Sequence, residues 1–293
     1  MIVNAAAGTG HAEDIAQQLV ALFAEHGLRA EVKCAQGPEA ERLAREAMRS
    51  RPQLLVAGGG DGTLSSVADA VRGTETALGV LPLGTFNHFA KDLGIPLELA
   101  EAVKVIAQGE RTRVDVGELN GACFINNASL GIYPVIVRRR EFQQRTLGRR
   151  KFSAMIWAIW SVLRRSPFMR LRVELDGESR AWRAPFIFIG NNVYNMQGFD
   201  IGTRERIDCG KLSLYSTPRG SRRGLVKLAL HALFGRLEQS KDFVAAEARE
   251  VRVESRHARM RVAADGELRL LQTPLEFRVV PRSLIVMTPQ RSA

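Results

Sequence analysis

The sequence predicts an α/β domain followed by a second domain that is rich in antiparallel β-strands. Three observations support this fold class. Residues 1–110 alternate short apolar runs with amphipathic helical patterns, as expected for a parallel sheet covered by helices. After about Gly117 the alternation stops, and period-two patterns between polar turns predict mainly antiparallel strands. Within the first region, the stretch VAGGGDGTLSSVADAV at 56–71 joins an apolar strand to a helix through four glycines.

The chain is long enough for two domains with separate hydrophobic cores. It has 293 residues, of which 45% are apolar and 25% charged, a composition typical of a globular protein. We place the first domain at 1–117 and the second at 118–279. The run LIVM at 284–287 is continuous and apolar, as in a buried strand, so 280–293 is expected to return to the first domain.

The elements of the first domain follow one another in strand and helix order. Strands are expected at 2–6, 28–34, 53–59 and 77–84, and all are apolar and short enough to be buried on both faces. Helices are expected at 11–27, at 38–50 and from about Thr63. In the first helix Ile15, Leu19 and Phe23 fall on one face, and Gly27 suits its C-cap.

The second domain is expected to contain several strands and two helical inserts. The strands lie at 111–120, 122–132, 170–177, 184–192, 211–218, 249–257 and 258–266, with two more runs in 273–290. The inserts, at 151–165 and 222–236, have apolar residues at helical spacing. The first insert has only about 12 apolar residues, or roughly 18 Å of helix, which is too short to span about 30 Å of hydrocarbon. Its flanking arginines and its tryptophans suit an interfacial helix, and a core helix is the alternative.

The glycine loop at 58–63 has the build of a phosphate-binding loop. Gly59, Gly60 and Gly62 lack the Cβ atoms that would hold a phosphate away from the main chain. The helix that follows adds the positive end of its dipole. Asp61 would repel a phosphate unless a Mg²⁺ ion lies between them or the carboxylate orients a neighbouring group. A tight strand-to-helix turn with Asp61 as the N-cap is the alternative interpretation.

A second polar loop follows the strand at 77–84. Gly84, Thr85 and Asn87 stand just before a short helix, where Thr85 can donate to a phosphate and Asn87 can donate or hold the opposite loop. Because the carboxyl ends of parallel strands meet at one edge of a sheet, three loops are expected to converge there and to form a ligand site. These loops lie at 4–10, 58–63 and 83–88.

Positive charge is concentrated in one segment. Arg138 to Arg172 holds eleven Arg or Lys against one acid, Glu141, so this segment accounts for nearly all of the net charge of +11. Such a block indicates an acidic partner, either an anionic membrane surface or a nucleic acid, and a solvated basic helix is the alternative. We expect no nucleic acid, because the block lacks a recognition module.

The cysteines and the N-terminus indicate an intracellular protein. Cys34, Cys123 and Cys209 are odd in number and far apart, which argues against a disulfide framework and against a zinc site. Met1 leads directly into a strand-like run without the features of a secretory signal. The expected location is therefore cytoplasmic, peripherally associated with the inner face of the membrane. A homodimer is among the assemblies that the sequence allows.

Three motifs, in this order along the chain, resemble the bacterial diacylglycerol kinase catalytic-domain family, which includes sphingosine and ceramide kinases. They are NAAAG at 4–8, GGDGT at 59–63 and GTFNHFAKDLGIP at 84–96. The likeness continues through IGNN, RIDCGKL and AADGE and covers essentially the whole chain. It implies a phosphofructokinase-like α/β nucleotide-binding domain and an antiparallel β-sandwich.

The resemblance implies ATP and Mg²⁺ as cofactors and a lipid hydroxyl as acceptor. It places ATP on one set of residues, namely Asn4, Gly8, Gly59, Gly60, Asp61, Gly62, Thr63, Gly84, Thr85 and Asn87. Asp61 would act through the Mg²⁺ of ATP. Asp265 would be the base that takes the proton of the lipid hydroxyl, with Glu267 as the other candidate; without the resemblance, AADGE is only a hairpin turn signal.

Two positions depart from the pattern of the family. His88 stands where many members have an Asp. In RIDCGKL, Cys209 replaces the second Asp of a structural Mg²⁺ site while Asp208 remains, and a thiol is a poor ligand for Mg²⁺. Either this second metal is absent or Asp208 compensates.

The motifs predict an ATP-dependent lipid kinase acting on a diacylglycerol-like acceptor, and two other functions are alternatives. An NAD kinase-like phosphotransferase shares GGDGT, but the loop at 84–96 and the basic amphipathic helix favour a lipid over a dinucleotide. A non-catalytic lipid or nucleotide sensor would fit the missing acid at Cys209, but the presence of Asp61 and Asp265 weighs against it.

Overall fold

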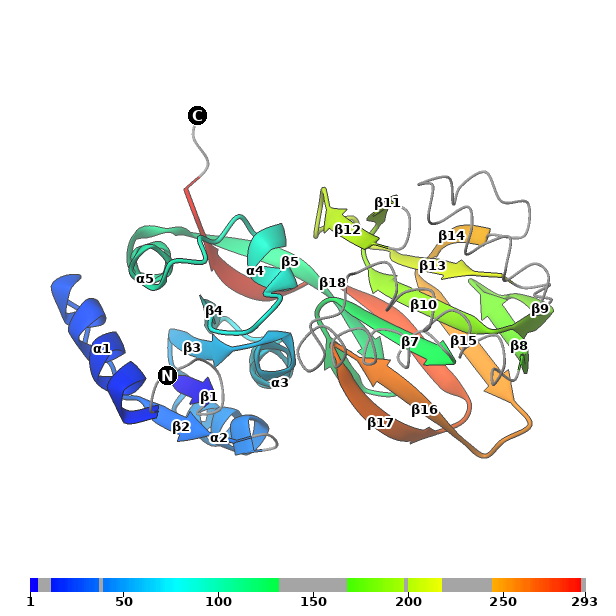
Figure 1. Ribbon diagram of the computed structural model, residues 1–293, viewed down its shortest axis with the longest axis horizontal. Coiled ribbons are helices and arrows are strands. Elements are labelled where there is room, and N and C mark those ends of the chain that lie inside the picture. The colour runs from blue at the N-terminus through cyan, green and yellow to red at the C-terminus, as the bar shows by residue number, and fades with distance from the viewer. Residues whose placement is uncertain (5–11, 37–38, 132–167, 198–199, 218–243, 291–293) are drawn as a thin grey trace, which may run out of the picture. The chain divides into compact units, whose positions relative to one another are not determined.

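The computed structural model describes residues 1–4, 12–36, 39–131, 168–197, 200–217 and 244–290 (Figure 1). The chain divides into two compact units. The first comprises Met1–Asn126, Thr203–Gly210 and Val279–Ala293, and the second comprises Asn127–Gly202 and Lys211–Arg278.

The first unit is built on a parallel sheet with the strand order β2-β1-β3-β4-β18 (Figure 1). The bounds of these strands are β1 Ile2–Asn4, β2 Lys33–Ala35, β3 Leu54–Gly59, β4 Ala77–Pro82 and β18 Leu275–Thr288. β5 (Glu110–Leu119) pairs with β18 and, in antiparallel register, with β6 (Ala122–Phe124). The fold class expected for this region is confirmed.

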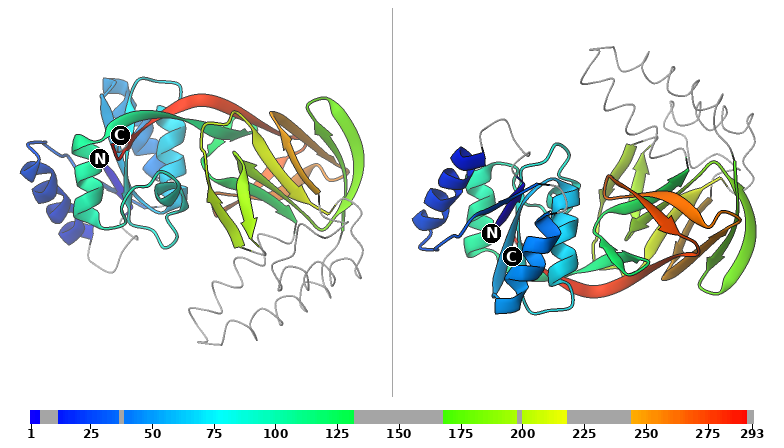
Figure 2. Two further views of the ribbon diagram at one scale, coloured as in Figure 1. Left: turned by 90° about the horizontal axis from the view of Figure 1, so that it is seen from above. Right: turned by 90° about the horizontal axis from the view of Figure 1, so that it is seen from below.

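Helices cover both faces of this parallel sheet. α1 (Ala12–Glu25) contacts α5 (Leu99–Gln108) on one face, and α2 (Glu39–Ala47) contacts α3 (Asp61–Val71) on the other (Figure 2). The short helix α4 (His88–Asp92) follows the loop after β4. A 3-10 turn at Met48–Ser50 continues α2.

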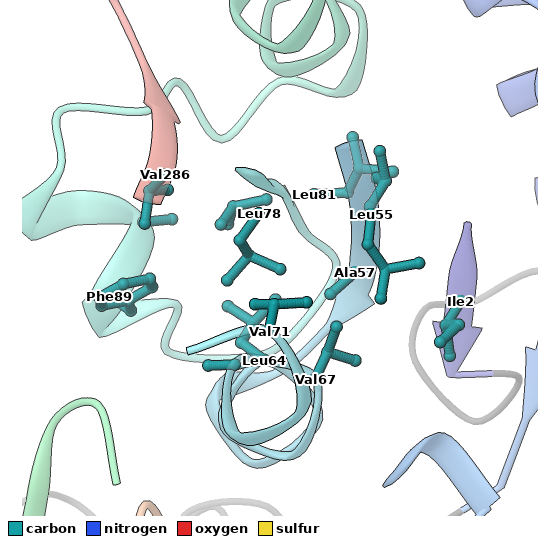
Figure 3. Close-up of a cluster of buried hydrophobic side chains, with 14 of the residues drawn as sticks. Ile2, Leu55, Ala57, Leu64, Val67, Val71, Leu78, Leu81, Phe89 and Val286 are labelled. Carbon is teal, nitrogen blue, oxygen red and sulfur yellow. The ribbon is translucent and has the colours of Figure 1, made fainter. Parts of the chain in front are cut away.

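The core of the first unit lies where β3, β4 and α3 meet. Figure 3 shows side chains from the sheet facing those of α3, with Phe89 of α4 and Val286 of β18 beside them. The buried residues labelled there are Ile2, Leu55, Ala57, Leu64, Val67, Val71, Leu78, Leu81, Phe89 and Val286. α3 is therefore held along its length, which fixes the direction of its N-terminus.

Two of the boundaries that differ from the sequence-based expectation have a clear local reason. α3 begins at Asp61 rather than near Thr63, because Gly60 is already the N-cap and its carbonyl accepts the first helical hydrogen bond from Leu64. β2 covers only Lys33–Ala35 instead of 28–34, because its partner β1 is three residues long and pairs with those three residues alone.

The run LIVM forms the C-terminal half of β18. Ile285 and Val286 pair in parallel with Ala77 and Leu78 of β4, as the continuous apolar pattern predicted. The first residues of the same strand, 275–278, belong to the second unit and pair with β15. One strand thus contributes to both units.

The second unit consists of antiparallel sheets, and the β-sandwich expected for it is confirmed. One sheet has the order β14-β13-β10-β7-β16-β17, and the other joins residues 275–278 of β18 to β15, β8 and β9. The strands are β7 Asn127–Gly131, β8 Met169–Leu175, β9 Glu178–Ala184, β10 Phe186–Asn191, β13 Leu212–Ser216, β14 Val244–Ala248, β15 Glu250–Ser255, β16 Arg259–Ala264 and β17 Glu267–Gln272. A small pair, β11 (Tyr194–Gln197) and β12 (Asp200–Arg204), completes the strands of the described residues.

Both predicted helical inserts and most of the basic segment lie outside the described residues. Of the basic segment the structure describes 168–172, where Arg170 and Arg172 are exposed on β8. In the part of the chain that is described, none of the helices is long and apolar enough to cross a membrane.

Candidate functional site

Three strands of the first unit end at the same edge of the sheet. The register pairs Val3 of β1 with Gly58 of β3, and Gly59 of β3 with Pro82 of β4. The residues that follow these strand ends therefore meet, as expected for the ligand edge of a parallel sheet. The amide of Asn4 donates to the Thr63 hydroxyl at 3.1 Å, which links the end of β1 to the first turn of α3.

Some glycines of the two loops are required by the packing of the chain, and one is not. A Cβ added at Gly59 would lie 2.7 Å from the Thr63 Cβ, and one added at Gly84 would lie 2.4 Å from the Gly60 Cα. These two glycines are therefore required by the packing of the chain itself. A Cβ at Gly60 would meet only the Gly84 Cα, at an ordinary 3.5 Å, among the described residues. The fold does not need a glycine at Gly60, so its missing side chain leaves room beside the N-terminus of α3.

Asp61 connects the glycine loop to α4. Its carboxylate accepts the backbone N–H groups of His88 at 3.3 Å and of Phe89 at 3.1 Å. These are amides of the first turn of α4, which intrahelical bonds leave open. Asp61 therefore orients a neighbouring segment, one of the two roles expected for it, and each of its oxygens keeps a lone pair for a further ligand.

Asn87 holds its own loop in place. Its side chain is buried, accepts from the Gly84 N–H at 2.9 Å and donates to the carbonyls of Pro82 and Gly84. Since both of its amide hydrogens are used, its role in the structure is to fix the turn and not to donate to a ligand. Thr85 is exposed on this turn, beside Phe86, whose ring stacks on His88 with centroids 5.6 Å apart. Gly8 lies outside the described residues.

A buried ion pair that no sequence pattern predicted holds the other end of α4. Arg204 donates to both carboxylate oxygens of Asp92, through its Nε at 2.7 Å and its backbone N–H at 3.2 Å. Its guanidinium also donates to the Ile125 carbonyl and to the Asn126 side chain. The domain limits expected from the sequence put 203–210 in the second domain. This segment lies in the first unit, where Arg204 anchors it.

The C-terminal part of α3 is tied to the β5–β6 hairpin. Asp69 accepts from the Cys123 N–H at 2.9 Å and from the Arg72 Nε at 3.0 Å. Arg72 also donates to the Glu118 carboxylate and to the Gly121 carbonyl. Burial lowers the pKa of Arg72, but the bond to Glu118 and the charge of Asp69 outweigh it, so the net direction is upward. The guanidinium stays charged and holds α3, and with it the glycine loop, in position.

Asp265 and Glu267 belong to the second unit, where Asp265 is the first central residue of a tight turn and Glu267 follows that turn. Asp265 and Gly266 have φ angles of 46° and 84°, as in a type I′ hairpin, which confirms the turn expected from Asp-Gly. Asp265 is buried and bonded to Asn127. Its N–H donates to the Asn127 carbonyl, and its Oδ1 accepts from the Asn127 N–H at 3.1 Å. Glu267 is exposed and paired with Arg269 at 3.1 Å.

The donors near Asp208 are a poor set for a metal ion. Asp208 is paired with Arg206 at 3.1 Å, and its neighbour Cys209 offers a thiol. The turn that contains them is fastened instead by the buried Asp115, whose carboxylate accepts the N–H groups of Gly210 at 2.6 Å and Arg282 at 2.8 Å. In the described part of the chain, no three His, Cys, Asp or Glu residues form a group that could hold a metal ion.

Comparison with protein families assigns both parts of the chain. Residues 1–119 match the diacylglycerol kinase catalytic domain, and residues 133–288 match the YegS C-terminal NAD kinase beta sandwich-like domain. The α/β unit with its glycine loop thus falls in the diacylglycerol kinase catalytic-domain class.

Individual relatives of the chain are described as probable lipid kinases. A "Probable lipid kinase YegS-like" of Klebsiella pneumoniae (strain 342) is 33% identical over 188 residues, and the match covers 62% of each chain. A protein with the same description from Pseudomonas aeruginosa is 35% identical over 188 residues, covering 62% of this chain and 60% of that protein. The matches thus span less than two thirds of the length of these relatives. Because the model of the C-terminal domain covers more than half of the chain, the chain belongs to the family that joins a diacylglycerol kinase catalytic domain to a YegS-type C-terminal domain.

A solved structure shows the same fold. A diacylglycerol kinase from Bacillus anthracis str. Sterne superposes with a TM-score of 0.73 over 98% of this chain and 95% of that chain. The two sequences are 20% identical, so this likeness concerns the fold alone.

Proposed function

We propose that the protein is a lipid kinase, which transfers the γ-phosphoryl group of ATP to the hydroxyl of a diacylglycerol-like lipid. The observation that carries the proposal is the loop edge of the first unit. There the glycine loop, the polar loop after β4 and the end of β1 are joined by hydrogen bonds, and Gly60 leaves room for a phosphate at the start of α3. The family membership and the names of the relatives favour a lipid as the acceptor.

In this proposal the residues of the chain position and neutralise the reacting groups. The N–H groups at the N-terminus of α3 bind phosphate oxygens, and the Thr63 hydroxyl is oriented by Asn4. Mg²⁺ carried by ATP would neutralise charge on the phosphates, and Mg²⁺ bound in this way needs only one or two carboxylates from the protein, here Asp61.

The base would be Asp265, which takes the proton of the lipid hydroxyl as that oxygen attacks the γ-phosphorus. Asp265 is favoured over Glu267, because its carboxylate is held by the Asn127 N–H while Glu267 is exposed and paired with Arg269. With the domain limits proposed from the sequence, the first domain would bind ATP and the second would present the lipid. The first domain comprises 1–117 and 280–293, and the second comprises 118–279. The protein would then act as a peripheral protein on the inner, cytoplasmic face of an anionic membrane.

The test is a transfer assay with a panel of acceptors. Purified protein is incubated with γ-labelled ATP and Mg²⁺ in mixed micelles that contain diacylglycerol, a sphingoid base, phosphatidylglycerol or a prenol, and NAD is assayed in parallel. Label in one lipid supports the proposal and names the acceptor. Label in NAD alone would identify an NAD kinase, and nucleotide binding without transfer to any acceptor would identify a sensor.

A further inference from the structure

The outer face of the β16–β17 hairpin is apolar and basic. In the described part of the chain, the two most exposed large apolar side chains are Leu270, at 59%, and Leu268, at 51%. Both lie on β17, the last strand in the order of its sheet. Residues paired across an antiparallel ladder have their side chains on the same face, and the register pairs Leu270 with Arg261 and Leu268 with Ala263.

The arrangement defines a continuous surface, which we call the outer hairpin face. It consists of Arg259, Arg261, Ala263, Leu268, Leu270 and Gln272. The opposite face of β16 is core, since Met260 and Val262 are buried and Val262 pairs with Leu130 of β7.

The outer hairpin face carries positive charge and no acid. Arg259 and Arg261 are exposed on it, and residues 256–264 include three Arg and one His without any Asp or Glu. The nearest exposed acid in sequence, Glu267, points to the opposite face and is paired with Arg269. The surface thus combines the two features that bind proteins to a bilayer, exposed leucines for the acyl boundary and arginines for anionic headgroups.

We propose that the outer hairpin face docks onto an anionic phospholipid bilayer. A second copy of the chain fits this face less well, because a two-fold contact would bring two copies of the same basic surface together, and this surface carries no acid. The face also lies on the hairpin that carries Asp265. Leu268 pairs with Ala263 and Leu270 with Arg261, two and four residues before Asp265. At about 3.3 Å per residue, they stand roughly 7 Å and 13 Å from Asp265 along the strand direction. This inference rests on the proposed lipid kinase function. It identifies the surface that would bring the membrane close to Asp265, the proposed base.

Vesicle co-sedimentation tests the docking surface directly. The probe is vesicles of phosphatidylglycerol and phosphatidylcholine at low salt, and the variants are Leu268→Gln with Leu270→Gln, and Arg259→Gln with Arg261→Gln. Each pair should weaken binding about tenfold or more, and the arginine pair should reduce its salt dependence. Val20→Gln with Leu28→Gln removes two exposed apolar residues elsewhere, and Arg42→Gln with Arg180→Gln removes the same charge elsewhere. These controls should bind within about twofold of the unmodified protein.

The outcomes separate this inference from the proposed function. Unchanged sedimentation of both test pairs overturns the docking surface. So does a dimer that the same substitutions convert to a monomer in light scattering, because the face is then an interface between copies. Transfer of label to a water-soluble short-chain acceptor reports the kinase step without a bilayer. If that transfer and all lipid labelling fail while vesicle binding still depends on Leu268 and Arg261, the kinase proposal is wrong and the docking surface stands.

Discussion

The hydrogen bonds of Asp61 show how an acid can stand in a glycine loop that we propose to bind phosphate. Its two oxygens accept the N–H groups of His88 and Phe89, so much of its charge is balanced by the N-terminus of α4. The same bonds fix the loop after β4 relative to the glycine loop. Asp61 is therefore a structural link between two loops of the site, whatever it adds through a metal.

Changing Asp265 to Asn should slow phosphoryl transfer by about 10² to 10⁴-fold, because the amide cannot take a proton. The fold should persist, since the amide oxygen can still accept from the Asn127 N–H and Asn tolerates the φ of 46°. Transfer rates with labelled ATP and calorimetric ATP affinity measure the two effects. Glu267→Gln is the matched control and should leave both near the unmodified values; a reversed pattern would move the role of base to Glu267.

Gly60 and Gly84 should respond differently to an added methyl group. Gly60→Ala places its Cβ 3.5 Å from the Gly84 Cα at a φ of −84°, so the free energy of unfolding should fall by no more than about 1 kcal/mol. ATP affinity should nevertheless be lost. Gly84→Ala places its Cβ 2.4 Å from the Gly60 Cα and should destabilise the protein by about 1 to 3 kcal/mol. Urea unfolding with calorimetry distinguishes them, and full ATP affinity in Gly60→Ala would contradict a phosphate at this position.

At the scale of elements, α4 is held at both ends by charged groups from distant parts of the chain. Asp61 binds its first turn, and Arg204 binds its last residue, Asp92. The Arg204 and Asp92 side chains are 0% and 3% exposed, so each depends on the other for compensation of its charge.

Arg204→Met should therefore destabilise the protein by about 3 to 5 kcal/mol, because it leaves the Asp92 carboxylate buried without a cation. Combining it with Asp92→Leu should recover a large part of that loss. Urea unfolding of the two single variants and the double variant gives the coupling energy. If the two losses simply added, the pair would not form as described.

The start of α5 should respond to acid. Glu98 is its N-cap, and the N–H of Glu101, with those of Ala100 and Leu99, holds the pKa of the Glu98 carboxyl below its usual 4.5. A lowered pKa means that the stabilisation is present above pH 4.5 and is lost as the pH falls through the folded-state value. Urea unfolding between pH 6 and pH 3 should show a shallower loss of stability in Glu98→Gln than in the unmodified protein. Parallel curves for the two proteins would contradict the cap.

Local patterns predicted most of the elements and the loop edge of the first unit. Glycine loops, apolar strands and the Asp-Gly turn are encoded by neighbouring residues, so the sequence alone located them. Arg204 was missed because its burial depends on Asp92, 112 positions away, and an arginine in a polar segment gives no local sign of this. β9 was missed because most of its side chains are exposed on both faces, which removes the period-two signal. β17 was missed because its exposed positions carry Leu268 and Leu270, while Arg269 is half-buried on the other face.

At the scale of the whole molecule, the C-terminal part of β18 contributes buried residues to the sheet of the first unit. Its Leu284, Ile285 and Val286 are all at most 4% exposed, and Ile285 and Val286 pair with β4. Burial of each is worth about 1.5 to 3 kcal/mol, and their sum is comparable to the total stability of a domain.

A chain truncated after Arg278 should therefore lose the cooperative unfolding of the first unit and its ATP binding. Circular dichroism during urea unfolding and calorimetry with ATP measure the two properties. A chain that ends at Gln290 retains the whole of β18 and is the control. ATP binding by the truncated chain would show that the sheet is stable without its fifth strand.

During synthesis on the ribosome, the fifth strand of the first sheet is made long after the other four. β1 to β4 and their helices emerge early, but the strand that lies beside β4 follows almost the entire second unit, some two hundred residues later. Until then Leu78 and Phe89 lack the neighbour Val286 that they have in the finished core (Figure 3). A nascent α/β segment thus exposes an unpaired strand edge for the whole synthesis of the second unit. An unpaired strand edge in an incompletely folded chain is a site of aggregation, so this interval is the one in which the nascent protein is most exposed to it.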